Sequence, residues 1–187
     1  ALKLSPGGHP YHAFAEAAAN AARSGGITPD EIASITASRP GLTKLSGPRH
    51  PEDLIDMAHS PSYFLAAGAA DRDFNWSNAS PEKIADPTIH RLIDLIKVGS
   101  APVEGVDKYR QGATVTIETK DGRTATNTVF VPKGAGCEGI DWADVDAKYR
   151  ALTPHAPLND SQIDASLAVI HDFRTADGAS ALIDLLR

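Results

Sequence analysis

The sequence has little of what marks several specialised classes of protein. It contains one cysteine, Cys137, among 187 residues, so no disulfide can form within the chain, and we expect a reducing, cytoplasmic setting. No apolar run approaches the ~20 residues that span a bilayer, and the first ten residues lack the apolar core of a signal peptide. Basic charge is not in excess, because 18 Lys and Arg face 24 Asp and Glu. These absences argue against a disulfide scaffold, a membrane protein and a protein that coats nucleic acid.

What is present fits a globular domain. Hydrophobic residues make up 42% of the chain and charged residues 22%, which is typical of a folded protein rather than a disordered one. A chain of this length buries ~70% of its unfolded surface, so it can build a core without disulfides. We therefore expect one ordinary domain, or one small domain with a helical extension.

Helices dominate the predicted secondary structure. Pro10 suits the first position of an alanine-rich helix that runs to about Arg23. Residues 54–70 are also helical in pattern, but Pro61 interrupts them, and Ser60 is the predicted cap of the helix that starts there. Further helices are predicted over residues 81–85, 87–98, 142–152, 160–173 and 179–186.

A few strands are expected in the middle of the chain. Residues 32–38 are rich in β-branched side chains, and residues 113–119 and 124–131 alternate as strands around Asp121-Gly122, a strong hairpin signal. Residues 39–51 contain several prolines and glycines and read as a loop. The predicted fold class is α+β, helix-rich with a small antiparallel sheet.

His9, His12 and Glu16 are spaced so that one helix face could carry them, as in a metal site with two imidazoles and a carboxylate. However, His9 precedes Pro10 and so lies at or before the helix start, and no other cluster supplies further ligands. We therefore expect no metal and no cofactor, and interpret these three side chains as polar residues near the start of a helix. Cys137 has no base at motif spacing, which argues against a catalytic thiol.

Two other positions suggest chemistry. Tyr63 is the third residue after Ser60, in the first turn of a helix, where N–H groups and the helix dipole favour a carboxylate ligand or a phenolate. The small residues 66–70 that follow would let another element approach closely. Lys3 lies in an irregular segment six residues before His9. The alternative reading of both, a surface lysine and a half-buried tyrosine, remains open.

Several segments, taken in order, resemble the second half of MmgE/PrpD-family enzymes. Residues 3–38 have the family's lysine and proline, an Ala/Glu-rich helix, a loop and an I-x-x-I strand: KLSPGGHPYHAFAEAAANAARSGGITPDEIASITAS. Residues 60–74, SPSYFLAAGAADRDF, have the family's serine, tyrosine and alanine-rich helix. The series continues through IADPTIHRLIDLIKV, ATVTIETKDGRTATNTVFVPKGAG, DWADVDAKYRAL and the C-terminal ASALIDLLR. The family includes 2-methylcitrate dehydratase, cis-aconitate decarboxylase and iminodisuccinate epimerase.

This resemblance implies a fold and a partner. Members of the family have a large all-helical domain and a smaller α+β lid domain, which is inserted before the last helices. Residues 1–150 match the lid, and residues 151–187 match the helices that return to the helical domain. We therefore expect a second chain to carry the N-terminal helical domain, in an assembly that is an oligomer.

The resemblance also implies a site and a reaction. The family's lysine falls on Lys3 and its tyrosine on Tyr63, which are the predicted catalytic residues, and His9, His12 and Ser60 are predicted to bind substrate. The implied chemistry is dehydration, decarboxylation, isomerisation or epimerisation next to a carboxylate of a small di- or tricarboxylic acid, without a metal. Such chemistry needs an acid or base and fixed positive charge. The alternatives are a non-catalytic lid-like module that binds a carboxylate or a partner protein, and an inactive remnant.

Overall fold

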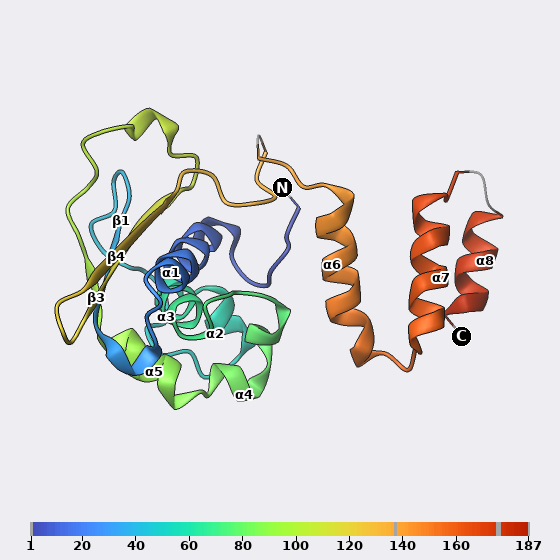
Figure 1. Cartoon of the computed structure of the whole chain (residues 1–187), viewed down its shortest axis with the longest axis horizontal. Coiled ribbons are helices and arrows are strands. Elements are labelled where there is room, and N and C mark those ends of the chain that lie inside the picture. The colour runs from blue at the N-terminus through green and yellow to red at the C-terminus, as the bar shows by residue number, and fades with distance from the viewer. Residues whose placement is uncertain (1, 137, 175–176, 187) are drawn as a thin grey trace. The chain divides into compact units, whose positions relative to one another are not determined.

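The computed structural model describes residues 2–136, 138–174 and 177–186. The chain divides into two compact units, Ala1–Gly139 and Ile140–Arg187 (Figure 1). The first unit combines helices with a sheet, and the second unit consists of helices, so the α+β class predicted from the sequence is confirmed. The family-based boundary after residue 150 stays a prediction.

Among the described residues, four strands form a mixed sheet in the order β2-β1-β3-β4. β1 pairs antiparallel with β3 and parallel with β2, and β3 pairs antiparallel with β4. β1 and β3 have the predicted bounds, whereas β4 ends two residues before residue 131. The strands are β1 Ile32–Ser38, β2 Ile96–Val98, β3 Ala113–Thr119 and β4 Thr124–Val129.

Strand β2 corrects the predicted secondary structure. The sequence predicts one helix over residues 87–98, but the helix, α5, covers Pro87–Asp94, and the chain then turns into β2. Ile96 lies opposite Ile35 of β1, and the Leu95 carbonyl accepts a hydrogen bond from the Ile35 N–H at 3.1 Å. Pairing with β1 satisfies these backbone groups, which a helical pattern in the sequence does not reveal. The sheet is therefore mixed rather than wholly antiparallel.

The hairpin predicted around Asp121-Gly122 is confirmed. Gly122 has a φ of +87°, and its N–H donates to the Thr119 carbonyl at 3.0 Å. Only glycine adopts this left-handed backbone without steric cost. Alternate residues of β3 are buried, whereas the partly exposed Thr114 hydroxyl lies 2.7 Å from that of Thr128 on β4. One face of the hairpin is therefore packed and the other is polar.

Helices α1 (His12–Ser24) and α3 (Pro61–Asp71) provide most of the core beside the sheet (Figure 1). α1 packs against α3, β3 and β4, and α3 packs against α5. A Cβ atom at Gly68 of α3 would lie 2.4 Å from the Ala15 carbonyl oxygen of α1. The two helices therefore approach so closely that the position requires glycine.

Proline and serine mark where the helices of the first unit begin. Pro10 lies in a 3-10 turn, His9–Tyr11, so α1 begins two residues later than predicted. The Ser60 hydroxyl accepts a hydrogen bond from the Tyr63 N–H at 3.1 Å, which confirms the predicted cap of α3. The other helices are α2 Leu54–Ala58 and α4 Pro81–Ile84, with 3-10 turns at Pro29–Glu31, Trp76–Ala79 and Val106–Lys108.

The second unit contains the three predicted C-terminal helices. They are α6 Trp142–Leu152, α7 Asp160–His171 and α8 Gly178–Leu185, with a 3-10 turn at Thr153–His155. Ile163 and Leu167 on the apolar stripe of α7 are buried, whereas Phe173, just beyond that helix, is half exposed. No helix in the described ranges is both long and apolar enough to cross a bilayer.

Candidate functional site

The N-terminal segment folds into a turn that carries three of the predicted site residues. Lys3 Nζ donates a hydrogen bond to the Gly7 carbonyl at 2.8 Å, and His12 Nε2 lies 3.2 Å from the Pro6 carbonyl oxygen. The ring centroids of His9 and His12 are 5.0 Å apart. Lys3, His9 and His12 therefore lie around one short turn.

Gly7 and Gly8 allow this turn to pack closely against α2 and α3. Gly7 has a φ of +80°, and a Cβ there would lie 2.6 Å from the Phe64 ring of α3. The Gly8 N–H donates to the Ala58 carbonyl at 2.9 Å, at the end of α2. The turn is thus seated on the same region of the core that holds the start of α3.

His12 is buried within this turn. Its side chain is packed against Phe64, with 5.9 Å between ring centroids, and the residue is 6% exposed. Burial lowers the pKa of His12 from 6.5 to about 4; the positive charges of His9 and Lys3 act in the same direction, and the hydrogen bond to Pro6 opposes it. Because a carbonyl oxygen only accepts, neutral His12 donates from Nε2. His12 is therefore a neutral donor within the turn at pH 7, and its predicted role in substrate binding stays a prediction.

His9 connects the turn to the loop before β3. Its Nδ1 lies 2.9 Å from Gln111 Oε1, so Nδ1 carries the hydrogen in this arrangement. His9 Nε2 is buried and has no hydrogen-bonding partner among the described residues. Gln111 has a φ of +61°, a left-handed conformation that is uncommon for a residue other than glycine. Such conformations persist where the surrounding structure enforces them, often at functional sites.

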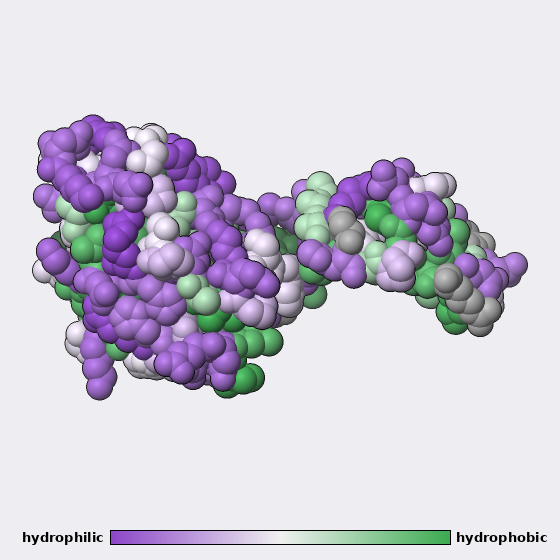
Figure 2. All heavy atoms as spheres, turned by 90° about the horizontal axis from the view of Figure 1, so that it is seen from below, coloured by the Kyte–Doolittle hydropathy of each residue, from purple (hydrophilic) through white to green (hydrophobic). Residues whose placement is uncertain are grey.

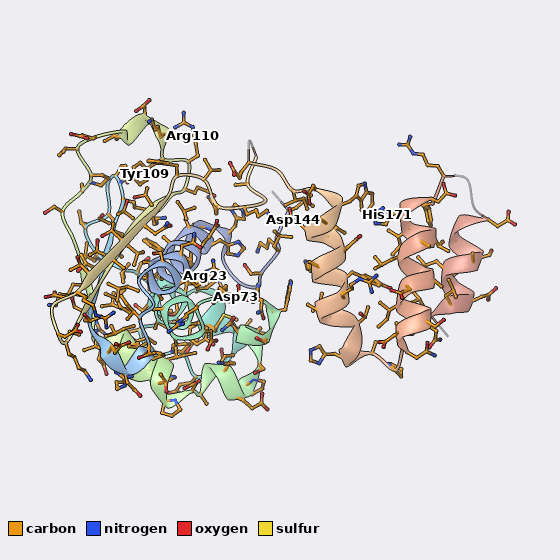
Figure 3. The ribbon with its side chains drawn as sticks, in the orientation of Figure 1. Arg23, Asp73, Tyr109, Arg110, Asp144 and His171 are labelled. Carbon is orange, nitrogen blue, oxygen red and sulfur yellow. The ribbon has the colours of Figure 1, made fainter. Side chains whose placement is uncertain are left out.

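A cavity of about 630 Å³ lies where His9 meets two loops of the first unit. The Leu2 N–H donates to the Gly134 carbonyl at 2.9 Å, so the segment that carries Lys3 runs beside one of these loops. Figure 3 shows Tyr109 and Arg110 on the other loop, which leads into β3. Among the residues that the structure describes, none that lines the cavity is acidic: they are His9, Tyr109, Arg110, Gln111, Val131, Ala135 and Gly136.

Ser60 and Tyr63 have hydrogen-bonding partners inside the fold. Both are fully buried, and the Tyr63 hydroxyl donates to the Asn78 carbonyl at 2.8 Å. Burial raises the pKa of Tyr63 above its usual value, and the carboxylates of Asp71 and Asp86 act in the same direction. This burial opposes a phenolate at Tyr63, and the prediction that the helix start favours a carboxylate ligand or a phenolate stays a prediction. The catalytic role of Tyr63 stays a prediction, as does substrate binding by Ser60.

Glu16 is the acidic residue of the possible metal triad, and its carboxylate is bonded to the backbone. Glu16 accepts a hydrogen bond from the Lys133 N–H at 3.2 Å, and burial raises the pKa of its carboxyl. Within the part of the chain that the structure describes, no three His, Cys, Asp or Glu side chains are placed to hold a metal ion. Cys137 lies outside the described residues.

Sequence reasoning misses Arg110 and Gln111, which line the cavity. Gln111 is 102 positions away from His9 along the chain, and no motif surrounds it. One local signal is Gly112, where a Cβ would lie 2.3 Å from the Phe130 carbonyl oxygen. This glycine shows that the loop must approach β4 closely, but it does not indicate a ligand.

The first unit is thus an α+β domain with a cavity whose lining includes His9 and Arg110. The family model described as MmgE/PrpD C-terminal domain matches residues 6–170, and the chain therefore belongs to the MmgE/PrpD family. This family includes dehydratases and other lyases. No curated protein matches the chain.

Proposed function

We propose that the chain is the C-terminal part of an MmgE/PrpD-like lyase or isomerase that acts next to a carboxylate of a small di- or tricarboxylic acid. The family match over residues 6–170 supports this class of enzyme. The structural observation that supports an anionic ligand is the cavity of about 630 Å³, whose described lining includes His9 and Arg110 and no acidic residue. Its volume lies within the range of small-molecule sites.

The proposed chemistry uses positive charge instead of a metal. Removing a proton beside a carboxylate builds negative charge on its oxygens, and a fixed cation stabilises that charge. Lys3 can supply it, because the hydrogen bond to Gly7 holds its ammonium at the turn that carries His9. The chain has a net charge of −6, so attraction for an anionic substrate must come from such nearby groups.

Proton transfer by Tyr63 is the second part of this proposal, and it rests on the family resemblance. The hydroxyl now donates to the Asn78 carbonyl, so it would have to exchange this partner for the substrate during the reaction. Because Tyr63 is fully buried, the chain around its hydroxyl would also have to open before a substrate could reach it.

We also propose a partner for the second unit, a polypeptide that carries the family's N-terminal helical domain. Apolar side chains gather at the surface of this unit, where Phe173, Ile183 and Leu186 are about half exposed (Figure 2). Contiguous apolar surface of this kind favours association with another protein. The isolated chain is therefore expected to self-associate, and light scattering that gives a stable 19.7 kDa monomer would count against the partner.

The proposal is tested by co-expressing the chain with the helical domain. Purified complex is assayed for dehydration of 2-methylcitrate, release of CO₂ from cis-aconitate and epimerisation of iminodisuccinate. We expect turnover of at least one of these acids, and a loss of about 100-fold or more in kcat/KM for Lys3→Ala. Lys3→Arg should restore activity only in part, because a planar guanidinium does not replace an ammonium.

Lys97→Ala is the matched control, since Lys97 is exposed on β2, at the opposite edge of the sheet from β4. Equal kinetics for Lys3→Ala and Lys97→Ala would remove Lys3 from the mechanism.

The second candidate function is a non-catalytic module that binds a carboxylate. The hydrogen bond between Tyr63 and the Asn78 carbonyl favours it, because the proposed proton donor is engaged within the fold. Carboxylate binding by the complex without turnover of any of the three acids would support this alternative over the enzyme.

A further inference from the structure

We propose that Arg110 and Gln111 form an anchor for one carboxylate of the ligand and make the site select acids with two or more carboxylates. This inference rests on the proposed function, because it assigns residues to ligand binding at the same cavity. Both residues line the cavity and belong to the loop that leads into β3.

Arg110 is held in place by neutral groups. Its backbone N–H donates to the Phe130 carbonyl at 2.8 Å, and its Nη1 donates to the carbonyls of Asp107 and Tyr109 at 2.5 and 3.3 Å. Within the described ranges, no carboxylate is paired with this guanidinium. Its charge and the donors on Nε and Nη2 are therefore left for a ligand, and a guanidinium matches a carboxylate with two parallel hydrogen bonds.

Gln111 adds a neutral donor beside this charge. Its Oε1 accepts from His9 Nδ1 at 2.9 Å, which leaves the amide NH₂ group to donate elsewhere. The left-handed backbone of Gln111, with φ of +61°, sets the direction in which its side chain leaves the main chain. Because the residue tolerates an unfavourable conformation and pairs with a cavity-lining histidine, we assign its amide to the same carboxylate as Arg110.

The charges around the cavity also favour an anion. Lys108 lies 5.8 Å from the Phe130 ring centroid, in the same loop region as Arg110. The nearby carboxylates of Glu16 and Glu138 do not line the cavity; Glu16 is bonded to the Lys133 N–H. The balance at the cavity wall is therefore positive, although the whole chain is acidic.

Selection of a diacid follows from a second cation, Lys3, whose segment lies beside the cavity. The bond between Leu2 and Gly134 places the Lys3 segment beside the loop that contributes Ala135 and Gly136 to the cavity. Arg110 reaches the cavity from the other loop. Lys3 does not itself line the cavity, so a diacid would meet both cations only if the Lys3 side chain exchanges the Gly7 carbonyl for the second carboxylate, whereas a monocarboxylate needs Arg110 alone.

The test measures ligand binding by the purified full chain with NMR spectroscopy. Succinate, butyrate and inorganic phosphate are the probes, and the signals of the Arg110 side chain and the His9 ring are followed. We expect succinate to bind more tightly than butyrate or phosphate. Arg110→Gln should weaken succinate binding about tenfold or more, the effect of losing one charge-assisted pair.

Three variants make the comparison specific. Gln111→Leu should weaken succinate binding by a smaller factor, because leucine has a similar size and lacks only the neutral amide donor. Arg110→Lys keeps the charge without the planar fork and should fall between wild type and Arg110→Gln. Lys97→Gln is the matched control, with the same loss of charge on β2, and should bind succinate as the wild type does.

Three results would overturn the anchor. The first is equal succinate affinity in wild type and Arg110→Gln, both shown to be folded by their spectra. The second is no response of Arg110 or His9 to succinate at ~10 mM, tenfold above a weak millimolar affinity. The third is phosphate or butyrate binding as tightly as succinate. Failure of the proposed enzyme is distinct, since it would leave succinate binding intact and abolish only turnover.

Discussion

Burial of His12 makes the stability of the protein depend on pH in a predictable way. The pKa of His12 is about 4 in the folded chain, against 6.5 for an unperturbed histidine. A pKa difference of about 2.5, at 1.36 kcal/mol for each unit, corresponds to ~3 kcal/mol of unfolding free energy. This is a large share of the ~5–15 kcal/mol that stabilises a typical domain.

The sign follows from where the proton binds. Below pH 6.5 the unfolded chain protonates His12, whereas the folded chain keeps it neutral until about pH 4. The unfolded state therefore binds more protons in this window, so the contribution of His12 is fully present above pH 6.5 and is lost as the pH falls toward 4. Glu16 acts in the opposite direction, because burial raises the pKa of its carboxyl and protonation then favours the folded state.

A variant isolates the histidine from Glu16 and the other acids. His12→Gln keeps a side-chain donor for the Pro6 carbonyl but does not titrate. Urea unfolding of both proteins at several pH values between 7 and 4 gives the free energy of unfolding of each. As the pH falls through this range, the wild type should lose ~3 kcal/mol more than His12→Gln.

The control is His155→Gln, since His155 is exposed and lies outside the turn that holds His12. A constant difference between wild type and His12→Gln across this range would refute the conclusion that His12 is buried in its neutral form.

Two further predictions concern the core. Tyr63→Phe should lower the free energy of unfolding by ~1 kcal/mol, and the melting temperature by roughly 3–5 °C, because the Asn78 carbonyl loses its donor. Calorimetry on the chain measures the change in melting temperature. A fall in kcat of ~100-fold or more for Tyr63→Phe in the complete enzyme would instead support proton transfer by Tyr63. Gly68→Ala should cost ~1–3 kcal/mol in urea unfolding, because its Cβ would meet the Ala15 carbonyl oxygen and force α1 and α3 apart. Gly136→Ala, whose Cβ would meet nothing within 4 Å, should leave stability nearly unchanged, and an equal loss in both variants would contradict the close helix contact.

Local features of the sequence were enough to predict most of the elements. Asp121-Gly122 predicts the hairpin because few residues other than glycine accept the backbone of its turn. Ser60 and Pro61 predict the start of α3, since the cap and the fixed φ of proline act within one turn of helix. The family could also be inferred from sequence, because an ordered series of short segments resembles it along most of the chain.

Prediction failed where distant residues decide the outcome. β2 is a strand because β1 lies beside it, although the sequence continues a helical pattern. The family resemblance predicts that Lys3 is a catalytic residue and that His9 and His12 bind substrate. The structure places the three around one short segment, and their roles stay predictions. The number and spacing of these three residues gave no indication of Gln111, which lies 102 positions from His9 in the sequence and contacts it in the fold.

The sequence by itself thus determined the class of fold, the existence of most helices and strands, and the family, because these depend on preferences that act over a few residues. The tertiary structure alone decided the surroundings of each candidate side chain. Burial lowers the pKa of His12 and raises that of Tyr63, and a loop before β3 brings Arg110 to the cavity. Hydration and charge at a site depend on every segment packed around it, and these segments come together only when the chain folds.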